Sequence, residues 1–167
     1  KLKPRAPFTT ASLQQAAYST LSFSVKQTSA IAQRLYQGMA LGDKEPVGLI
    51  SYMRTDSTNL SDECLKDISN YLGKNHKKYQ SNEIRKYSKK VKNAQEAHEA
   101  IRPTSISNTP MKVKKYLEDA DFKLYELIWK RTVASQMIDA TYKQVGIEFL
   151  LGSKFLYKYS GSFLKDN

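Results

Sequence analysis

The hydrophobic pattern of this sequence changes its period near residue 141. Before that point, several segments repeat apolar residues every three or four positions, as on one face of an α-helix. After it, TYKQVGIEFLL and KFLYKYSGSF alternate between apolar and polar residues across a Gly-Ser pair, as in two strands joined by a turn. We therefore expect a mostly α fold with a small β component (α+β), in which a helical domain precedes strands of an incomplete second β domain.

Capping residues mark the ends of the first helices. Thr9, Thr10 and Ser12 can each cap a short helix over LQQAAYSTL. Ser24 can cap a second helix, and Gly38 stands where that helix would end. The two helices together resemble a helix-turn-helix pair. Further helices are predicted over three ranges: 62–72, 94–101 and 121–138.

The predicted elements divide the chain into three parts. These are an extended basic linker, a helical domain and a partial β-rich domain: residues 1–8, 9–139 and 140–167. Inside the helical domain, residues 47–54 are rich in β-branched and aromatic side chains and predict a short strand. Residues 74–93 predict a basic surface loop. Because the chain begins at Lys1 rather than Met, we expect it to be a piece of a longer protein.

The charge balance points to a polyanionic partner. The chain has 27 Lys and Arg residues against 16 Asp and Glu, a net charge of +11. Nucleic acid is the first candidate and an acidic membrane surface the second, with simple solubility as the alternative explanation. No apolar run approaches the roughly 20 residues that cross a bilayer. No predicted helix joins a basic face to a strong apolar one either, so we expect no membrane partner. Cys64 is the only cysteine, which excludes an intrachain disulfide and suits a reducing compartment.

Common phosphate-binding and hydrolytic motifs are absent from the sequence. It contains no GxxxxGK, GxGxxG, HExxH or GxSxG, and its two histidines have no clustered metal-ligand spacing. We therefore expect neither ATP-driven chemistry nor a metal site in this chain. The residues suited to chemistry lie instead in GLISYMRTDSTNLS, Gly48 to Ser61.

Tyr52 and Arg54 would point to the same face of a strand over residues 47–54, because side chains two positions apart do so. A guanidinium can hold two phosphate oxygens, and a phenol beside it is placed to attack phosphorus. Neighbouring positive charge would stabilise both the phenolate and the transition state. The attack would form a phosphotyrosine ester and release a sugar hydroxyl, with no need for a nucleotide cofactor. From the residues alone, a purely structural role remains an open alternative, in which Tyr52 packs on an aromatic residue of a neighbouring strand and Arg54 is solvated.

Several segments resemble those of one enzyme family, in the same order. GLISYMRTDSTNLS is similar to the active-site segment of bacterial type IA DNA topoisomerases, whose nucleophile is the tyrosine of YMRTDS. PFTTASLQQAAY and QEAHEAIRPT are similar to two further family motifs. FSVKQTSAIAQRLYQG and LYELIWKRTVASQM match helices before and after the active-site segment. The methionine of YMRT favours the topoisomerase I branch over the topoisomerase III branch.

The resemblance implies roles for individual residues. Tyr52 would attack a single-strand phosphodiester and hold the 5′ phosphate covalently. Arg54 would orient and stabilise the scissile phosphate, and His98 would contact a DNA phosphate. Without the family, His98 would be an ordinary hydrogen-bonded histidine. Four further residues are implied as DNA contacts: Gln33, Ser51, Thr55 and Arg102.

The resemblance also implies what this chain lacks. The acidic magnesium-binding domain of the family has no counterpart here, so the chain would carry the nucleophile yet be unable to cleave alone. Magnesium is thus expected in the full-length enzyme and no cofactor in this chain. The implied fold is a winged-helix-like tyrosine-bearing domain followed by strands of an arch domain. The implied enzyme is a monomer that relaxes negatively supercoiled DNA through a single-stranded segment, in the cytoplasm at the nucleoid, or in an organelle in a eukaryote.

Two other interpretations stay open. A non-catalytic, winged-helix-like nucleic-acid-binding module would fit the helix pair, the charge and the tyrosine-containing basic loop. A tyrosine recombinase shares phosphotyrosine chemistry, but it links through the 3′ phosphate and relies on a group of arginines. Only Arg54 lies close to Tyr52 in sequence. A cluster of Tyr52, Arg54 and His98 would favour an enzyme over a binding module.

Overall fold

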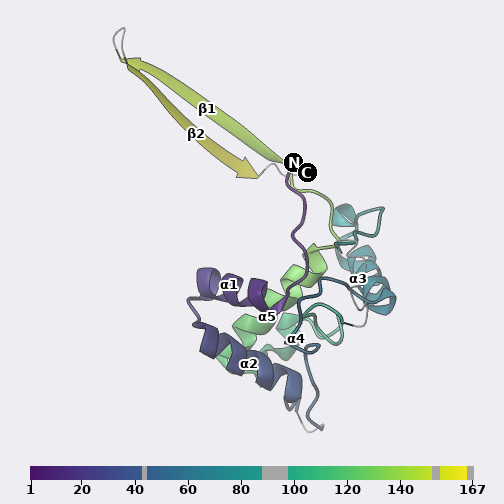
Figure 1. Cartoon of the computed structure of the whole chain (residues 1–167). Helices are drawn as coiled ribbons and strands as arrows, with labels where there is room; N and C mark the ends of the chain where they lie inside the picture. Colours follow the sequence, from purple (N-terminus) through teal and green to yellow (C-terminus); the bar gives the residue numbers. More distant parts are fainter. Residues whose placement is uncertain (43–44, 88–97, 152–154, 165–167) are drawn as a thin grey trace. The chain divides into compact units, whose positions relative to one another are not determined.

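The computed structural model describes residues 1–42, 45–87, 98–151 and 155–164. The chain separates into a larger unit, Arg5–Met137, and a smaller one formed by Lys1–Pro4 and Ile138–Asn167. The described residues hold five α-helices and one two-stranded antiparallel sheet, an α+β composition (Figure 1). Within the described ranges, none of the helices has both the length and the apolar composition needed to cross a membrane.

Two capped helices open the larger unit. Helix α1 spans Thr10–Leu21, and the side chain of Thr9 caps its first turn. Helix α2 spans Val25–Gln37, with Ser24 as its N-cap and Gly38 at its end with a φ of 137°. Both helices and their caps were expected from the sequence, and the structure confirms them.

Helix α5 is the central helix of the larger unit (Figure 1). It spans Asp119–Ala134 and packs against α1, α2 and the short α4, Pro110–Val113. Helix α3 spans Asp62–Asn75 and contacts α5 through an edge-to-face pair of Tyr71 and Trp129, with ring centroids 5.2 Å apart. One hydrophobic cluster joins these elements; its largest fully buried apolar side chains include Phe8, Ile31, Leu35, Leu49, Ile50, Ile68, Leu72, Ile101, Leu124 and Ile128.

The first eight residues are not a free linker. Phe8 is fully buried, forms a bridge with Ile101, and has the guanidinium of Arg131 4.1 Å from its ring centroid. The larger unit therefore begins at Arg5, earlier than the predicted boundary after residue 8. An aromatic side chain in the core overrides the local preference of a proline-rich segment for an extended linker.

The basic loop predicted over residues 74–93 starts later than expected, because α3 continues to Asn75. A single 3-10 turn, η1, follows at Lys77–Tyr79. The described residues after it pack on the end of α5: Gln80 forms a bridge with Met137, and the Tyr87 hydroxyl donates to the Ser135 carbonyl at 2.8 Å. The remainder, 88–93, lies outside the described residues.

The predicted strand over 47–54 is wrong as a continuous strand. The structure has only single-residue bridges there, Val47 with Met39 and Ile50 with Pro103. A ladder needs one partner strand that runs alongside for several residues. Here the partner changes along the segment, since the Leu49 N–H donates to Leu35 while Met53 and Thr55 bond to the start of α1.

The predicted helix over 94–101 is also not found in its described part. Residues 94–97 lie outside the described residues, and 98–101 are not helical. The Ala100 N–H donates to the Asn59 carbonyl at 2.8 Å, and the Ile101 N–H donates to the Phe8 carbonyl at 2.8 Å. These long-range bonds replace the i to i−4 bonds that a helix would need.

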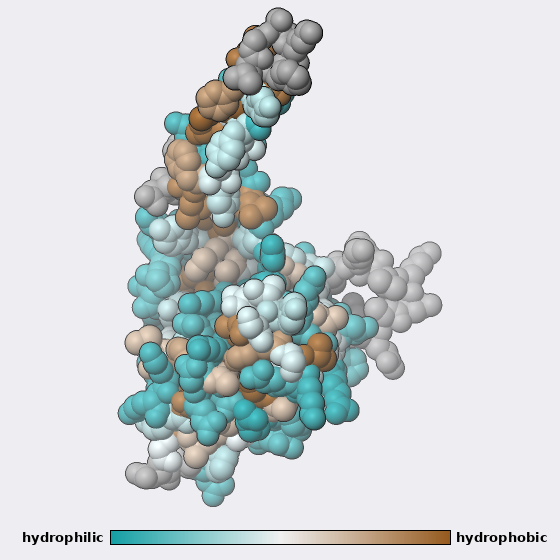
Figure 2. Space-filling model, turned by 90° about the vertical axis from the view of Figure 1, so that its left-hand side faces the viewer, coloured by the Kyte–Doolittle hydropathy of each residue, from teal (hydrophilic) through white to brown (hydrophobic). Residues whose placement is uncertain are grey.

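The smaller unit contains the two predicted strands as an antiparallel hairpin. Strand β1 spans Tyr142–Leu151 and β2 spans Phe155–Leu164, and Leu2 forms a bridge with Ala140. The predicted turn at Gly152-Ser153 lies outside the described residues. The register puts six exposed apolar or aromatic side chains on one face: Val145, Ile147, Phe149, Tyr157, Tyr159 and Phe163. Figure 2 shows hydrophobic residues at the surface along this hairpin.

Candidate active site around Tyr52

Ser51 anchors the start of the tyrosine segment, defined here as residues 51–55. Its hydroxyl donates to the Ala100 carbonyl at 2.7 Å and accepts from the Arg102 N–H at 3.0 Å. Its own N–H donates to the Arg102 carbonyl at 2.8 Å. The Ser51 side chain is thus occupied by the protein itself, and its expected DNA contact stays a prediction.

Thr10, the first residue of α1, anchors the other end of the segment. Its hydroxyl donates to the Met53 carbonyl at 2.8 Å and accepts from the Thr55 N–H at 2.9 Å. Its backbone N–H donates to the Thr55 carbonyl at 2.9 Å. Sequence reasoning missed this role and treated Thr10 as an alternative cap. The available signal was the second threonine of PFTTASLQQ, whose hydroxyl is free for another partner once Thr9 caps the helix.

The anchored segment presents Tyr52 and Arg54 to solvent. Met53 between them is buried, with 7% of its surface exposed, whereas 45% of Tyr52 is exposed. Arg54 is exposed as well. The alternation expected for these three residues is therefore present without a strand, because the buried Met53 side chain and the hydrogen bonds on either side hold the backbone extended.

The ring of Tyr36, at the end of α2, packs edge to face against Tyr52, with centroids 5.4 Å apart. Gly48 makes the close approach of the two segments possible. A Cβ at that position would lie 2.7 Å from the Tyr36 carbonyl oxygen, nearer than real Cβ contacts occur. The nucleophile candidate is therefore positioned by α2 as well as by α1.

Arg54 and His98 line one pocket of about 480 Å³. The start of α1 and residues 55–56 complete its lining, with Asp56 as the carboxylate among the described lining residues. The amino end of a helix carries partial positive charge, so this pocket combines three features that favour an anion. Tyr52 does not line it, but lies two residues from Arg54. Thr55 lines the pocket too, so three of the seven predicted site residues meet there.

Arg102 and Gln33 have other surroundings. The Arg102 side chain is 17% exposed, its Nη2 lies 2.6 Å from Glu99 Oε2, and its Nη1 donates to the Pro103 carbonyl at 2.9 Å. Gln33 is half-buried on α2. The DNA contacts expected of both residues stay predictions.

Glu99, which sequence reasoning did not single out, connects the His98 segment to α3. It pairs with Arg102 and accepts from the Ser61 N–H at 2.7 Å, at the N-cap of α3. Burial, the largest single influence, raises the pKa of Glu99. The hydrogen bonds from Arg102 and Ser61, together with the Arg102 charge, outweigh burial and hold that pKa below its ordinary value.

The described residues do not fit a magnesium site. No group of three or more His, Cys, Asp and Glu side chains in the described part of the chain could hold a metal ion. Magnesium prefers carboxylate oxygens, and only Asp56 is present among the described residues around the Arg54–His98 pocket.

Comparisons with known proteins agree with these features. A family model described as DNA topoisomerase matches residues 1–165. DNA topoisomerase 1 of Xylella fastidiosa (strain Temecula1) is 45% identical over 166 residues, which cover 97% of this chain and 20% of that protein. DNA topoisomerase 1 of Rickettsia felis is 56% identical over 138 residues, covering 82% of this chain and 18% of that protein.

The backbone gives a similar result. The structure of full-length topoisomerase I from Thermotoga maritima superposes with a TM-score of 0.78 at 38% sequence identity, covering 100% of this chain and 26% of that one. The chain spans about one fifth of the length of the curated relatives it matches. Since motif, sequence and backbone agree over nearly its whole length, the chain belongs to the bacterial DNA topoisomerase family, in the type IA topoisomerase I branch.

Proposed function

We propose that this chain supplies the nucleophile of a DNA topoisomerase I, which relaxes negatively supercoiled DNA by single-strand cleavage, strand passage and religation. The observation that carries the proposal is the exposed Tyr52 anchored two residues from Arg54, which shares a pocket with His98. A protein that only binds nucleic acid has no need for a phenol held beside an anion-binding pocket.

In this proposal the Tyr52 hydroxyl oxygen attacks a backbone phosphorus of single-stranded DNA. A bond forms between that oxygen and phosphorus, and the bond from phosphorus to the 3′ oxygen breaks. The phenol gives up its proton, and the leaving 3′ oxygen takes one up. The products are a 5′-phosphotyrosine ester and a free 3′ hydroxyl. Because one phosphodiester replaces another, the reverse attack reseals the strand without a nucleotide cofactor.

The Arg54–His98 pocket would hold and stabilise the phosphate. A guanidinium offers paired donors to the phosphoryl oxygens, and the dipole of α1 favours negative charge at its amino end. Such donors act most strongly on the transition state, where charge on the phosphoryl oxygens increases. The role of Tyr36 would be to limit the orientations of the Tyr52 ring before attack.

Magnesium is the expected cofactor of the longer enzyme and would assist phosphoryl chemistry there. Since the described residues do not form a site for it, the residues of this chain would bind and orient the strand and provide the nucleophile. The chain on its own is therefore expected to be inactive in cleavage.

The finer architecture belongs to the same proposal. Residues 9–139 would form the winged-helix-like tyrosine domain, and residues 140–167 would contribute strands to an arch domain. The exposed apolar face of the hairpin supports the second point, because such a face is usually covered in a complete sheet. The enzyme would act as a monomer on a single-stranded segment of negatively supercoiled DNA, in the cytoplasm at the nucleoid.

A second candidate is a winged-helix-like nucleic-acid-binding module without catalysis. The net charge of +11 is the observation that favours it, since binding to a polyanion needs no nucleophile. The two candidates differ in one outcome: only the enzyme forms a covalent bond to DNA.

The test is complementation in trans. This chain is mixed with the separately produced magnesium-binding portion of the longer enzyme and an end-labelled single strand. Covalent adducts are then counted on a denaturing gel for the unmodified chain, Tyr52→Phe and Arg54→Ala. Tyr18→Phe is the matched control, because Tyr18 is also exposed but lies on α1.

We expect a magnesium-dependent adduct that disappears with Tyr52→Phe, persists with Tyr18→Phe and decreases strongly with Arg54→Ala. Loss of one donor to a developing oxyanion costs about two to three orders of magnitude in rate. DNA binding without an adduct, under conditions in which the intact enzyme cleaves, would leave only the binding module.

A further inference from the structure

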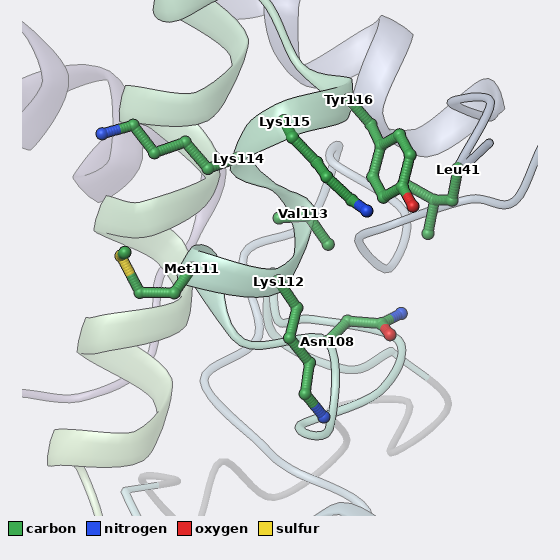
Figure 3. Close-up of a pocket in the computed structure, with 8 residues that line it drawn as sticks. All are labelled: Leu41, Asn108, Met111, Lys112, Val113, Lys114, Lys115 and Tyr116. Atoms are coloured by element: carbon green, nitrogen blue, oxygen red, sulfur yellow. The ribbon is translucent and has the colours of Figure 1, made fainter.

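The larger unit has a second basic hollow, formed by residues that are not involved in the Tyr52 site. It measures about 880 Å³ and is called the Lys115 pocket here (Figure 3). Most of its lining comes from one short stretch of sequence, MKVKKY, which holds three lysines. The lining residues are Leu41, Asn108, Met111, Lys112, Val113, Lys114, Lys115 and Tyr116.

The walls of the Lys115 pocket are fixed to the core. Val113 is 2% exposed and holds α4 in place, and the 3-10 turn η2, Lys114–Tyr116, follows directly. The buried Tyr125 of α5 donates its hydroxyl to the Asn108 carbonyl at 2.5 Å. Burial raises the pKa of Tyr125, so this donor keeps its proton at all physiological pH values. The pocket is therefore supported by the central helix.

The side chains divide into two sets, as Figure 3 shows. Lys115, Tyr116 and Leu41 face a common space with Asn108 on its lower side, and the Lys112 side chain extends downward beside Asn108. Lys114 extends away from that space, and its Nζ lies 5.3 Å from the ring centroid of Phe122. Lys114 thus points to the side opposite Lys115, although all three lysines contribute to the lining.

The donors in this space are not saturated by the protein. Lys112 Nζ donates to the Ser107 carbonyl at 3.1 Å, which uses one of the three hydrogens of an ammonium group. Lys115 Nζ lies 4.7 Å from the ring centroid of Tyr116, a cation–π contact that leaves its hydrogens available to an anion. No Asp or Glu is present among the described lining residues to neutralise them.

One exposed ammonium group lies over an aromatic ring, and a second belongs to the same pocket lining. This combination suits a ligand that carries both negative charge and a flat face. Single-stranded nucleic acid has this chemistry, because its phosphates attract cations and its unpaired bases stack on aromatic rings. Duplex DNA offers the phosphates but keeps its bases stacked on each other. A membrane surface would require a larger exposed apolar area beside the lysines.

We propose that Lys112, Lys115 and Tyr116 form a second contact for single-stranded DNA, distinct from the Arg54–His98 pocket. The two lysines bind phosphates of the strand, and the Tyr116 ring stacks on an unpaired base. The proposal rests on the proposed function in that the same substrate is bound. It adds a place where the strand is held away from the bond that is cut.

The test compares two double variants of this chain with equal charge loss. Lys112→Gln/Lys115→Gln removes two lysines of the hollow, and Lys26→Gln/Lys66→Gln removes two exposed lysines, on α2 and α3, that do not line it. Binding to a fluorescent single-stranded 20-mer is measured by anisotropy at several salt concentrations, and thermal unfolding checks that both variants are folded. We expect the first variant to bind about tenfold more weakly and to lower the slope of log K against log salt by about 1.4, that is, 0.7 for each phosphate contact.

The control double variant should change affinity by less than about twofold, since its lysines act only through long-range charge. Equal weakening by the two variants would overturn the proposal, because charge alone would then explain binding. Tyr116→Ala is expected to remove the preference for single-stranded over duplex DNA of the same sequence, while Tyr116→Phe should retain it. A preference unchanged in Tyr116→Ala would contradict the stacking contact.

The outcome is separable from that of the Tyr52 test. Adduct formation reports on Tyr52 and is measured at saturating DNA, whereas the second contact is read from binding alone. An adduct that requires Tyr52, with equal binding by the two lysine variants, would reject only the second contact. If the Lys112/Lys115 variant loses binding selectively while the complemented enzyme forms no adduct, only the catalytic function is rejected.

Discussion

The ring of Tyr52 packs edge to face against the ring of Tyr36, with an interplanar angle of 66°. This contact holds the nucleophile candidate while leaving 45% of its surface exposed. An aromatic pair of this kind contributes about 0.5–1.5 kcal/mol beyond the burial of its area.

Tyr36→Leu should therefore reduce the rate of covalent adduct formation several-fold and lower the free energy of unfolding by about 1 kcal/mol. The rate is measured in the complemented enzyme, and stability by urea unfolding of the chain. Tyr18→Leu removes a more exposed tyrosine from α1, 70% against 40% for Tyr36, and should change neither quantity appreciably. An unaltered adduct rate in Tyr36→Leu would show that the ring contact does not position Tyr52.

Thr10→Val should destabilise the larger unit and slow adduct formation more than it weakens DNA binding. The hydroxyl of Thr10 bonds to both Met53 and Thr55, and its loss leaves a carbonyl and an N–H without their partner. The expected cost is about 1–3 kcal/mol in the free energy of unfolding. Thr10→Ser retains the hydroxyl and should recover most of the adduct rate. If Thr10→Ser does not recover the adduct rate, the methyl group of Thr10 rather than its hydroxyl holds the segment.

Gly48→Ala should be strongly destabilising, by about 2 kcal/mol or more, because the new Cβ would lie 2.7 Å from the Tyr36 carbonyl oxygen and neither backbone can move freely. Gly146→Ala, on β1, meets no atom within 4 Å and serves as the control. Thermal unfolding of both variants checks this prediction. Similar midpoints for the two would mean that residues 47–49 shift easily relative to α2.

The pair of Glu99 and Arg102 should make stability depend on pH in the acid range. Because the folded state lowers the pKa of Glu99, the carboxylate stabilises the fold above the ordinary glutamate pKa. That stability is lost as the pH falls through the lowered value. Glu99→Gln should cost on the order of 0.5–1 kcal/mol at pH 7, given a side chain that is 33% exposed to screening solvent. The difference in the free energy of unfolding between the unmodified chain and Glu99→Gln, measured by urea unfolding, should vanish at low pH. A difference that does not change with pH would exclude the ion pair as its cause.

Cys64 should give the opposite dependence in the alkaline range. Burial raises the pKa of its thiol to about 11 from 9.0, so the folded state holds the proton more tightly than the unfolded state. The resulting stability is complete below pH 9 and decreases as the pH rises from 9 toward 11. Cys64→Ala should lack this decrease, which unfolding measurements between pH 8 and 11 can check. In the native protein at pH 8, iodoacetamide should modify the thiol only as fast as the chain opens.

Local signals were sufficient to locate α1, α2, α3, α5 and the β-hairpin. Caps such as Thr9, Ser24 and Ser61 act on N–H groups within one turn, and a hydrophobic period is a property of one element. The YMRTDS motif likewise singled out Tyr52 and Arg54 as candidates from adjacent residues, through its resemblance to the active-site segment of the family.

Tertiary structure alone decided how those residues are held. Tyr52 is positioned by Tyr36, Thr10 and the residues around 100, which lie 16 to about 50 positions away in the sequence. No local pattern records such contacts, because they form only when the buried Met53 and Ile50 enter the core. The same reason explains why residues 47–54 and 98–101 are irregular although their composition favours a strand and a helix. Backbone groups of Val47, Leu49, Ser51, Ala100 and Ile101 pair with distant segments rather than with their own neighbours.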